Sequence, residues 1–145
     1  MKKTILMFFL IAIIVIVAIF INYSVYKIQY DNIVKENAEF EQYKDREIYG
    51  IELGTLINKA IDKNTKNEIE KDDKGRFIQN DENSIEIEIY MLDNDTTYKM
   101  ETLYNAGTEE FVQHYRNIKF KCSKIEYHQN TGRVKYLYFE QIQTS

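Results

Sequence analysis

The chain has 145 residues with 19 basic and 23 acidic side chains, and its formal net charge is −4 at pH 7. Lys2 and Lys3 are the only charged side chains before Asn22, so the acidic excess lies entirely in the rest of the chain. An acidic surface argues against nucleic acid as a partner. Because Cys122 is the only cysteine, an internal disulfide is excluded and packing must stabilise the fold.

An unbroken apolar run extends from Ile5 to Ile21. As a helix it has about the length that crosses the hydrocarbon core of a bilayer, and we expect residues 1–22 to form a transmembrane anchor. A cleavable signal peptide and a buried core helix are the alternatives. Bulky residues after the run disfavour the first, and the lack of a polar face disfavours the second. Residues spaced along the anchor are Ile5, Phe9, Ile13, Val17 and Ile21.

The lysines predict the orientation of this anchor. Lys2 and Lys3 stand directly before the run, whereas Lys27 and Lys35 on its other side are accompanied by acidic residues. The side richer in basic residues stays in the cytoplasm. We therefore expect a single-pass protein of the cell membrane whose C-terminal domain is extracytoplasmic.

Residues 23–46 are expected to continue the helix as an amphipathic juxtamembrane segment. Mostly apolar and aromatic residues recur there at the spacing of a heptad seam. The members of this stripe are Tyr23, Tyr26, Tyr30, Ile33, Asn37 and Phe40. Two interpretations remain open. The stripe is either a self-association seam in which Asn37 sets the register, or a surface that packs on the protein's own domain.

Residues 47–145 are expected to form one small domain. Its first helix follows Gly50, and Asn64 is expected to end that helix in the left-handed conformation. The apolar residues of this helix fall on one face. They are Leu53, Leu56, Ile57, Ala60 and Ile61.

Alternating apolar and polar residues predict a half-solvated antiparallel strand at Ile85–Ile89, and Phe77–Ile78 is expected to form a short strand before it. Asp93–Asp95 is expected to turn the chain into a return strand at Tyr98–Leu103. Asn105–Gly107 would close this hairpin.

Thr108 is expected to cap a short helix with Phe111 on its inner face. A last hairpin pairs Ile118–Tyr127, bulged near Ser123, with Val134–Ile142, whose two apolar faces place it in the centre of the sheet. The sequence therefore predicts an α+β fold: a long N-terminal helix, one or two further helices, and an antiparallel sheet of about four or five strands.

No combination of residues predicts a catalytic, cofactor or metal site. Cys122 and His128 are too far apart on one strand to touch, and Asp93–Asp95 lacks the glycine and glutamate of a calcium loop. Tyrosines on the strands, such as Tyr136 and Tyr138, are typical of protein-binding surfaces, although cross-strand pairing is the alternative. We therefore expect no enzyme activity and no cofactor.

The layout resembles that of type IV pilins and pseudopilins, in which an apolar helix runs into an amphipathic half and then a small domain closed by an antiparallel sheet. Where that family has a glycine before the run and a glutamate at its fifth position, this chain has Thr4 and Phe9. Strings at Glu47–Gly50, Leu56–Asp62 and Gly132–Val134 are similar to an uncharacterised set of small single-pass proteins from low-G+C Gram-positive bacteria. Both resemblances imply display at a membrane.

From these features we expect a non-enzymatic, membrane-anchored extracytoplasmic protein, pilin-like in shape. It would act by protein–protein contact in a cell-envelope assembly, and its N-terminal helix would bind a protein partner or a second copy. The alternative function is a membrane-anchored sensory domain that binds a small ligand between the Leu53–Ile61 helix and the sheet.

Overall fold

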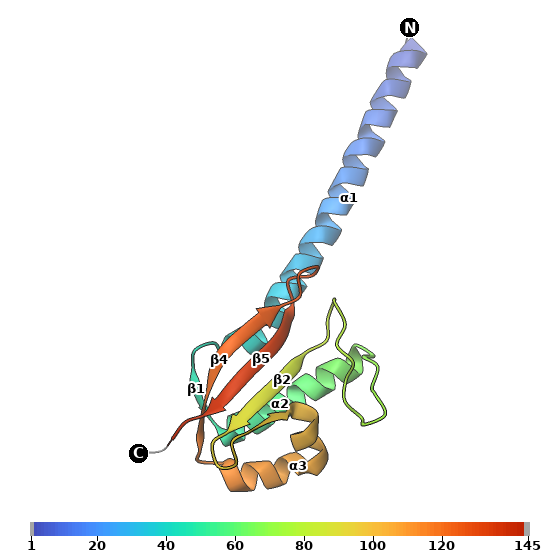
Figure 1. Cartoon of the computed structure of the whole chain (residues 1–145). Helices are drawn as coiled ribbons and strands as arrows, with labels where there is room; N and C mark the ends of the chain where they lie inside the picture. The colour runs from blue at the N-terminus through green and yellow to red at the C-terminus, as the bar shows by residue number, and fades with distance from the viewer. Residues whose placement is uncertain (1, 144–145) are drawn as a thin grey trace. The chain divides into compact units, whose positions relative to one another are not determined.

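The structure, a computed structural model, describes residues 2–143 and contains two compact units, Met1–Glu36 and Asn37–Ser145. Its first helix, α1, spans Lys2–Glu41 without interruption and so confirms the long N-terminal helix (Figure 1). The helix ends before residue 46, where the sequence placed its end. Tyr43 and Lys44 donate turn hydrogen bonds to the last helical carbonyls, and Asp45 has a positive φ of 57°.

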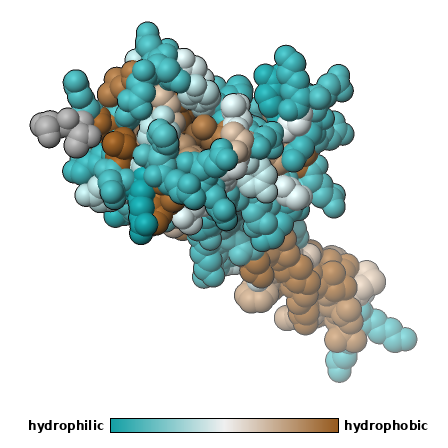
Figure 2. Space-filling model, turned by 90° about the horizontal axis from the view of Figure 1, so that it is seen from below, coloured by the Kyte–Doolittle hydropathy of each residue, from teal (hydrophilic) through white to brown (hydrophobic). Residues whose placement is uncertain are grey.

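The apolar run of α1 is long and apolar enough to cross a membrane. Its side chains are exposed, whereas the side chains of a soluble core helix are mostly buried. Figure 2 shows the resulting hydrophobic surface in brown. The first polar side chains after the run donate hydrogen bonds to backbone carbonyls of the same helix. Asn22 donates to the carbonyl of Ala18 and Ser24 to that of Phe20, both at 2.8 Å, which lowers the cost of placing them near a bilayer.

The second unit is built on one sheet with the strand order β1-β4-β5-β2-β3 (Figure 1). Its strands are β1 (Glu47–Tyr49), β2 (Glu86–Met91), β3 (Thr96–Lys99), β4 (Lys119–Tyr127) and β5 (Val134–Gln141). The pairings are antiparallel except between β2 and β5, which run parallel. The α+β class and the mostly antiparallel sheet are confirmed, and the parallel pair corrects the all-antiparallel expectation.

Helix α2 (Gly50–Lys66) supplies the core face that the sequence predicts, with Leu53 and Ile57 fully buried. The expected end at Asn64 is wrong. Asn64 lies within α2, and its side chain is buried. The side-chain amide donates to the carbonyl of Ile85 at 2.7 Å and accepts from the backbone N–H of Ile85 at 2.8 Å. The C-cap is Asn67, and the left-handed residue is Glu68, with a φ of 55°.

Helix α3 (Met100–Tyr115) replaces the second half of the expected return strand. β3 stops at Lys99, and the expected turn at Asn105–Gly107 lies inside the helix, where Gly107 has a non-helical φ of 107°. Met100 and Leu103 fit helical as well as strand spacing, so such a short pattern did not decide between them. The segment after Gly107 agrees with the predicted helix, and Phe111 is buried.

The last hairpin agrees with its prediction. β5 lies in the centre of the sheet between β4 and β2, and the register shifts between Cys122 and Lys124, beside the expected bulge at Ser123. Phe77–Ile78 forms no strand, only an isolated bridge with Lys71, because the N–H of Phe77 is bound by the Glu101 carboxylate at 3.1 Å.

The core lies on one face of the sheet. Inward side chains of the strands, including Ile87, Ile89 and Phe139, pack in one cluster with residues of both helices and with Phe40 at the end of α1. The alternate residues of β2 and β5, such as Glu88 and Tyr136, are half-buried on the opposite face. The second unit therefore has two layers, the sheet and the helices on its core face. The opposite face of the sheet carries half-buried side chains.

Candidate functional site

The structure divides the predicted stripe of α1. Tyr23, Tyr26 and Tyr30 are more than half exposed, and Ile33 is half-buried. Phe40, in contrast, is 1% exposed in the core of the second unit.

Asn37 is bound in the same unit as Phe40. Its side-chain amide donates to the Gly132 carbonyl and accepts from the Val134 N–H, both at 2.8 Å. The end of the stripe therefore packs on the protein's own domain, and the tyrosines are the part that is exposed.

Tyrosines on the uncovered sheet face form a polar network. The rings of Tyr136 and Tyr138 stack at 6.5 Å, and the Lys124 ammonium lies 5.6 Å from the Tyr136 ring centroid. The Tyr136 hydroxyl donates to Glu88 at 2.8 Å, and Lys99 lies 3.8 Å from the same carboxylate. Burial, with the Glu88 carboxylate, raises the pKa of Tyr136. Tyr136 and Tyr138 therefore contact each other and neighbouring side chains, and both are half-buried.

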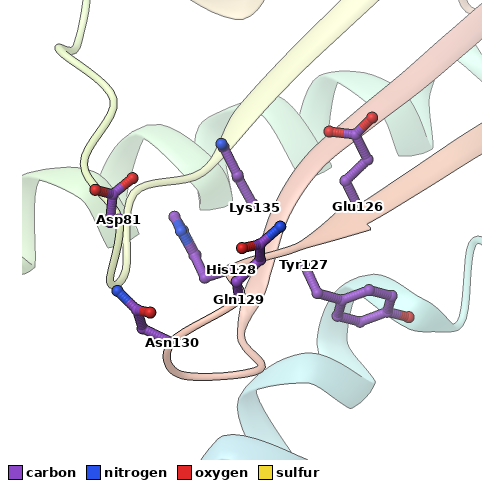
Figure 3. A pocket seen from close by; sticks show the side chains of 7 residues that line it. All are labelled: Asp81, Glu126, Tyr127, His128, Gln129, Asn130 and Lys135. Carbon is purple, nitrogen blue, oxygen red and sulfur yellow. The ribbon is translucent and has the colours of Figure 1, made fainter.

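A polar cavity of about 460 Å³ lies beside the β4–β5 turn (Figure 3). Two carboxylates, one ammonium, two amides, a phenol and an imidazole line it. They belong to Asp81, Glu126, Tyr127, His128, Gln129, Asn130 and Lys135. Its size lies within the usual range for small-molecule sites, but its lining is more polar than that of most of them.

Hydrogen bonds hold the two loops that form the walls of this cavity. In the loop before β2, the Asn80 side-chain oxygen accepts from three successive N–H groups, those of Glu82, Asn83 and Ser84. The β4–β5 turn is closed by a 2.8 Å bond from the Gly132 N–H to the His128 carbonyl. The Thr131 hydroxyl joins the two loops by donating to the Glu82 carbonyl at 2.6 Å.

His128 is the buried residue of the cavity wall, with 2% of its surface exposed. Its Nε2 lies 2.7 Å from the Ser84 carbonyl oxygen, so Nε2 carries the hydrogen. In the neutral ring Nδ1 is then an acceptor, and it has no partner among residues 2–143. An unpaired buried acceptor is costly, which singles out this position.

Cys122 does not form a nucleophile with either histidine. Its thiol is buried in the core beside the Lys124 carbonyl, and burial raises its pKa to about 11. The thiol is thus protonated at neutral pH and unsuited to attack. Among residues 2–143, no three His, Cys, Asp or Glu side chains are gathered to hold a metal ion.

The space between α2 and the sheet, where the sequence placed a possible ligand site, is filled by packed core side chains. Leu53, Leu56 and Ile57 of α2 are at most 1% exposed there. An open groove of about 390 Å³ lies instead between α2 and α3, where Gly54 faces Val112. The sequence predicted neither this groove nor the polar cavity. The cavity was missed because Gln129–Gly132 has the composition of an ordinary turn.

Comparison with known proteins gives no match to a protein family, to a curated protein or to a solved structure.

Proposed function

We propose that this is a membrane-anchored, non-enzymatic extracytoplasmic protein, pilin- or pseudopilin-like, which acts by protein–protein contact in a cell-envelope assembly. The observation that carries the proposal is the exposure of Tyr23, Tyr26 and Tyr30 directly after the apolar run. Aromatic rings of this kind suit both the headgroup region of a bilayer and the centre of a protein interface.

The contact is assigned to the first part of the stripe, which consists of the exposed Tyr23, Tyr26 and Tyr30 and the half-buried Ile33. Asn37 and Phe40 are excluded from it because their own domain already binds them. The contact surface is thus shorter than a full heptad seam, and a membrane that aligns the helices would strengthen a seam of this length.

Co-purification from membranes tests this proposal. A tagged chain is solubilised in mild detergent, and an untagged copy and other bound proteins are identified. Tyr30→Lys with Ile33→Lys places two desolvated charges in the contact and is expected to abolish co-purification.

The matched control, Gln29→Lys with Asn32→Lys, adds the same charge at neighbouring exposed positions outside the stripe. It should keep its partner, as should Asn37→Ala. Co-purification that survives Tyr30→Lys with Ile33→Lys contradicts the proposal, and so does an unaltered chain that retains nothing.

A further inference from the structure

We propose that the polar cavity beside the β4–β5 turn binds a small zwitterion, a free amino acid or a short peptide, whose carboxylate meets Lys135 and whose ammonium meets Asp81. This site is independent of the contact assigned to α1. All of its lining residues belong to the second unit.

Charge decides the class of ligand. Glu126 is paired with Lys124 at 2.5 Å, so its charge is already balanced. Asp81 and Lys135 line the same cavity, and neither has an ion-pair or hydrogen-bond partner for its side chain within residues 2–143. A simple anion would be repelled by Asp81 and a simple cation by Lys135, whereas a zwitterion satisfies both.

The remaining lining groups favour a polar ligand over an apolar one. Gln129 and Asn130 present amides that have no side-chain partners in the described chain. His128 contributes a buried polar nitrogen, Nδ1, that has no partner among residues 2–143. Figure 3 shows Tyr127 directed away from Asp81 and His128, so polar groups dominate that side of the cavity. An amide-bearing amino acid such as glutamine can both donate to and accept from such groups.

Metal binding is the competing use of carboxylates and a histidine. It is disfavoured because Asp81, Glu126 and His128 line one cavity without being gathered at ligand distances. The site is also preorganised. The Asn80 turn and the Thr131–Glu82 bond fix its two walls before any ligand arrives, which lowers the entropic cost of binding.

Isothermal titration of the full chain in lipid nanodiscs tests the site. L-glutamine and glycyl-L-glutamine are the probes, and they separate a free amino acid from a short peptide. We expect at least one of them to bind. N-acetyl-glycyl-L-glutamine lacks the ammonium and glycyl-L-glutamine amide lacks the carboxylate, so each should bind at least about tenfold more weakly than glycyl-L-glutamine if the peptide is the ligand.

Variants locate the binding. Asp81→Asn and Lys135→Gln should each weaken it at least about tenfold, and both should fold because neither side chain has a partner within residues 2–143. The controls Asp73→Asn and Lys74→Gln remove the same charges from an exposed turn and should leave binding unchanged. Binding that survives Asp81→Asn and Lys135→Gln overturns the proposal, as does the absence of heat with both probes at about 10 mM.

Discussion

Single side-chain amides organise much of the second unit. Asn37 binds the start of β5 through both ends of its amide, and Asn64 does the same at Ile85 before β2. Each bond satisfies a backbone group that the ladder leaves free. At Asn64, where the bonds are buried, an unsatisfied group of this kind would cost about 1–3 kcal/mol. Asn37 therefore stabilises its own domain, and its place in the heptad stripe does not require self-association with a second helix.

The buried thiol of Cys122 predicts a pH dependence of stability. Its pKa is raised from 9.0 to about 11 in the folded protein. Below pH 9 the thiol is protonated in both the folded and the unfolded chain, so it does not change the free energy of unfolding. Between pH 9 and 11 the thiol ionises only in the unfolded chain, and the free energy of unfolding therefore falls by about 1.4 kcal/mol per pH unit.

Urea unfolding of the full chain in detergent, followed by tyrosine near-UV circular dichroism under reducing conditions, measures this effect. The difference in unfolding free energy between the unaltered chain and Cys122→Ala should fall by about 2 kcal/mol from pH 9 to 11. A difference that stays constant over this range would mean that the thiol ionises freely in the fold.

At the scale of elements, the packing of α2 against α3 depends on Gly50. A β-carbon at this position would lie 2.1 Å from the backbone carbonyl oxygen of Tyr115, which cannot yield as a flexible side chain would. Gly50 also donates its N–H to the Ile118 carbonyl at 2.9 Å. The close approach therefore fixes both the start of α2 and the end of α3.

Gly50→Ala is expected to destabilise the second unit by about 3 kcal/mol or more, because overpacking against backbone forces the elements apart. Gly132→Ala is the matched control. Its φ is +69° but no atom lies within 4 Å of the added carbon, so only the conformational cost of about 1 kcal/mol applies. Equal midpoints in thermal unfolding for the two variants would refute this account of Gly50.

Local patterns predicted those elements whose pattern has a single interpretation. The face of α2, the alternation of β2 and the central position of β5 were confirmed. The parallel pairing of β2 with β5 escaped prediction because alternation reveals a buried face and not the direction of the neighbouring strand. The three-residue strand β1 carries one buried side chain, Ile48, which is too little for a period.

The polar cavity was not predictable for a related reason. Asp81 lies in the loop before β2, whereas His128 and Lys135 lie at the two ends of the β4–β5 turn, far along the chain, and each of these two segments alone has the composition of a turn or a strand end. The parallel pairing of β2 with β5 and hydrogen bonds such as the one between Thr131 and Glu82 bring the two segments together. The long apolar helix is the opposite case, because a local run of apolar residues specifies it.

At the scale of the whole molecule, the central claim is that an uncleaved helix anchors the chain in a membrane with the second unit outside. The exposed apolar run of α1 and the lysines before it support this claim. It is tested most directly by adding protease to intact cells that make the chain with a C-terminal tag, and by recording the size of the tagged band before and after treatment. The account predicts a full-length band before treatment that disappears when protease is added. A band already shortened by the apolar run, or a full-length band that resists protease until the cells are lysed, would contradict it.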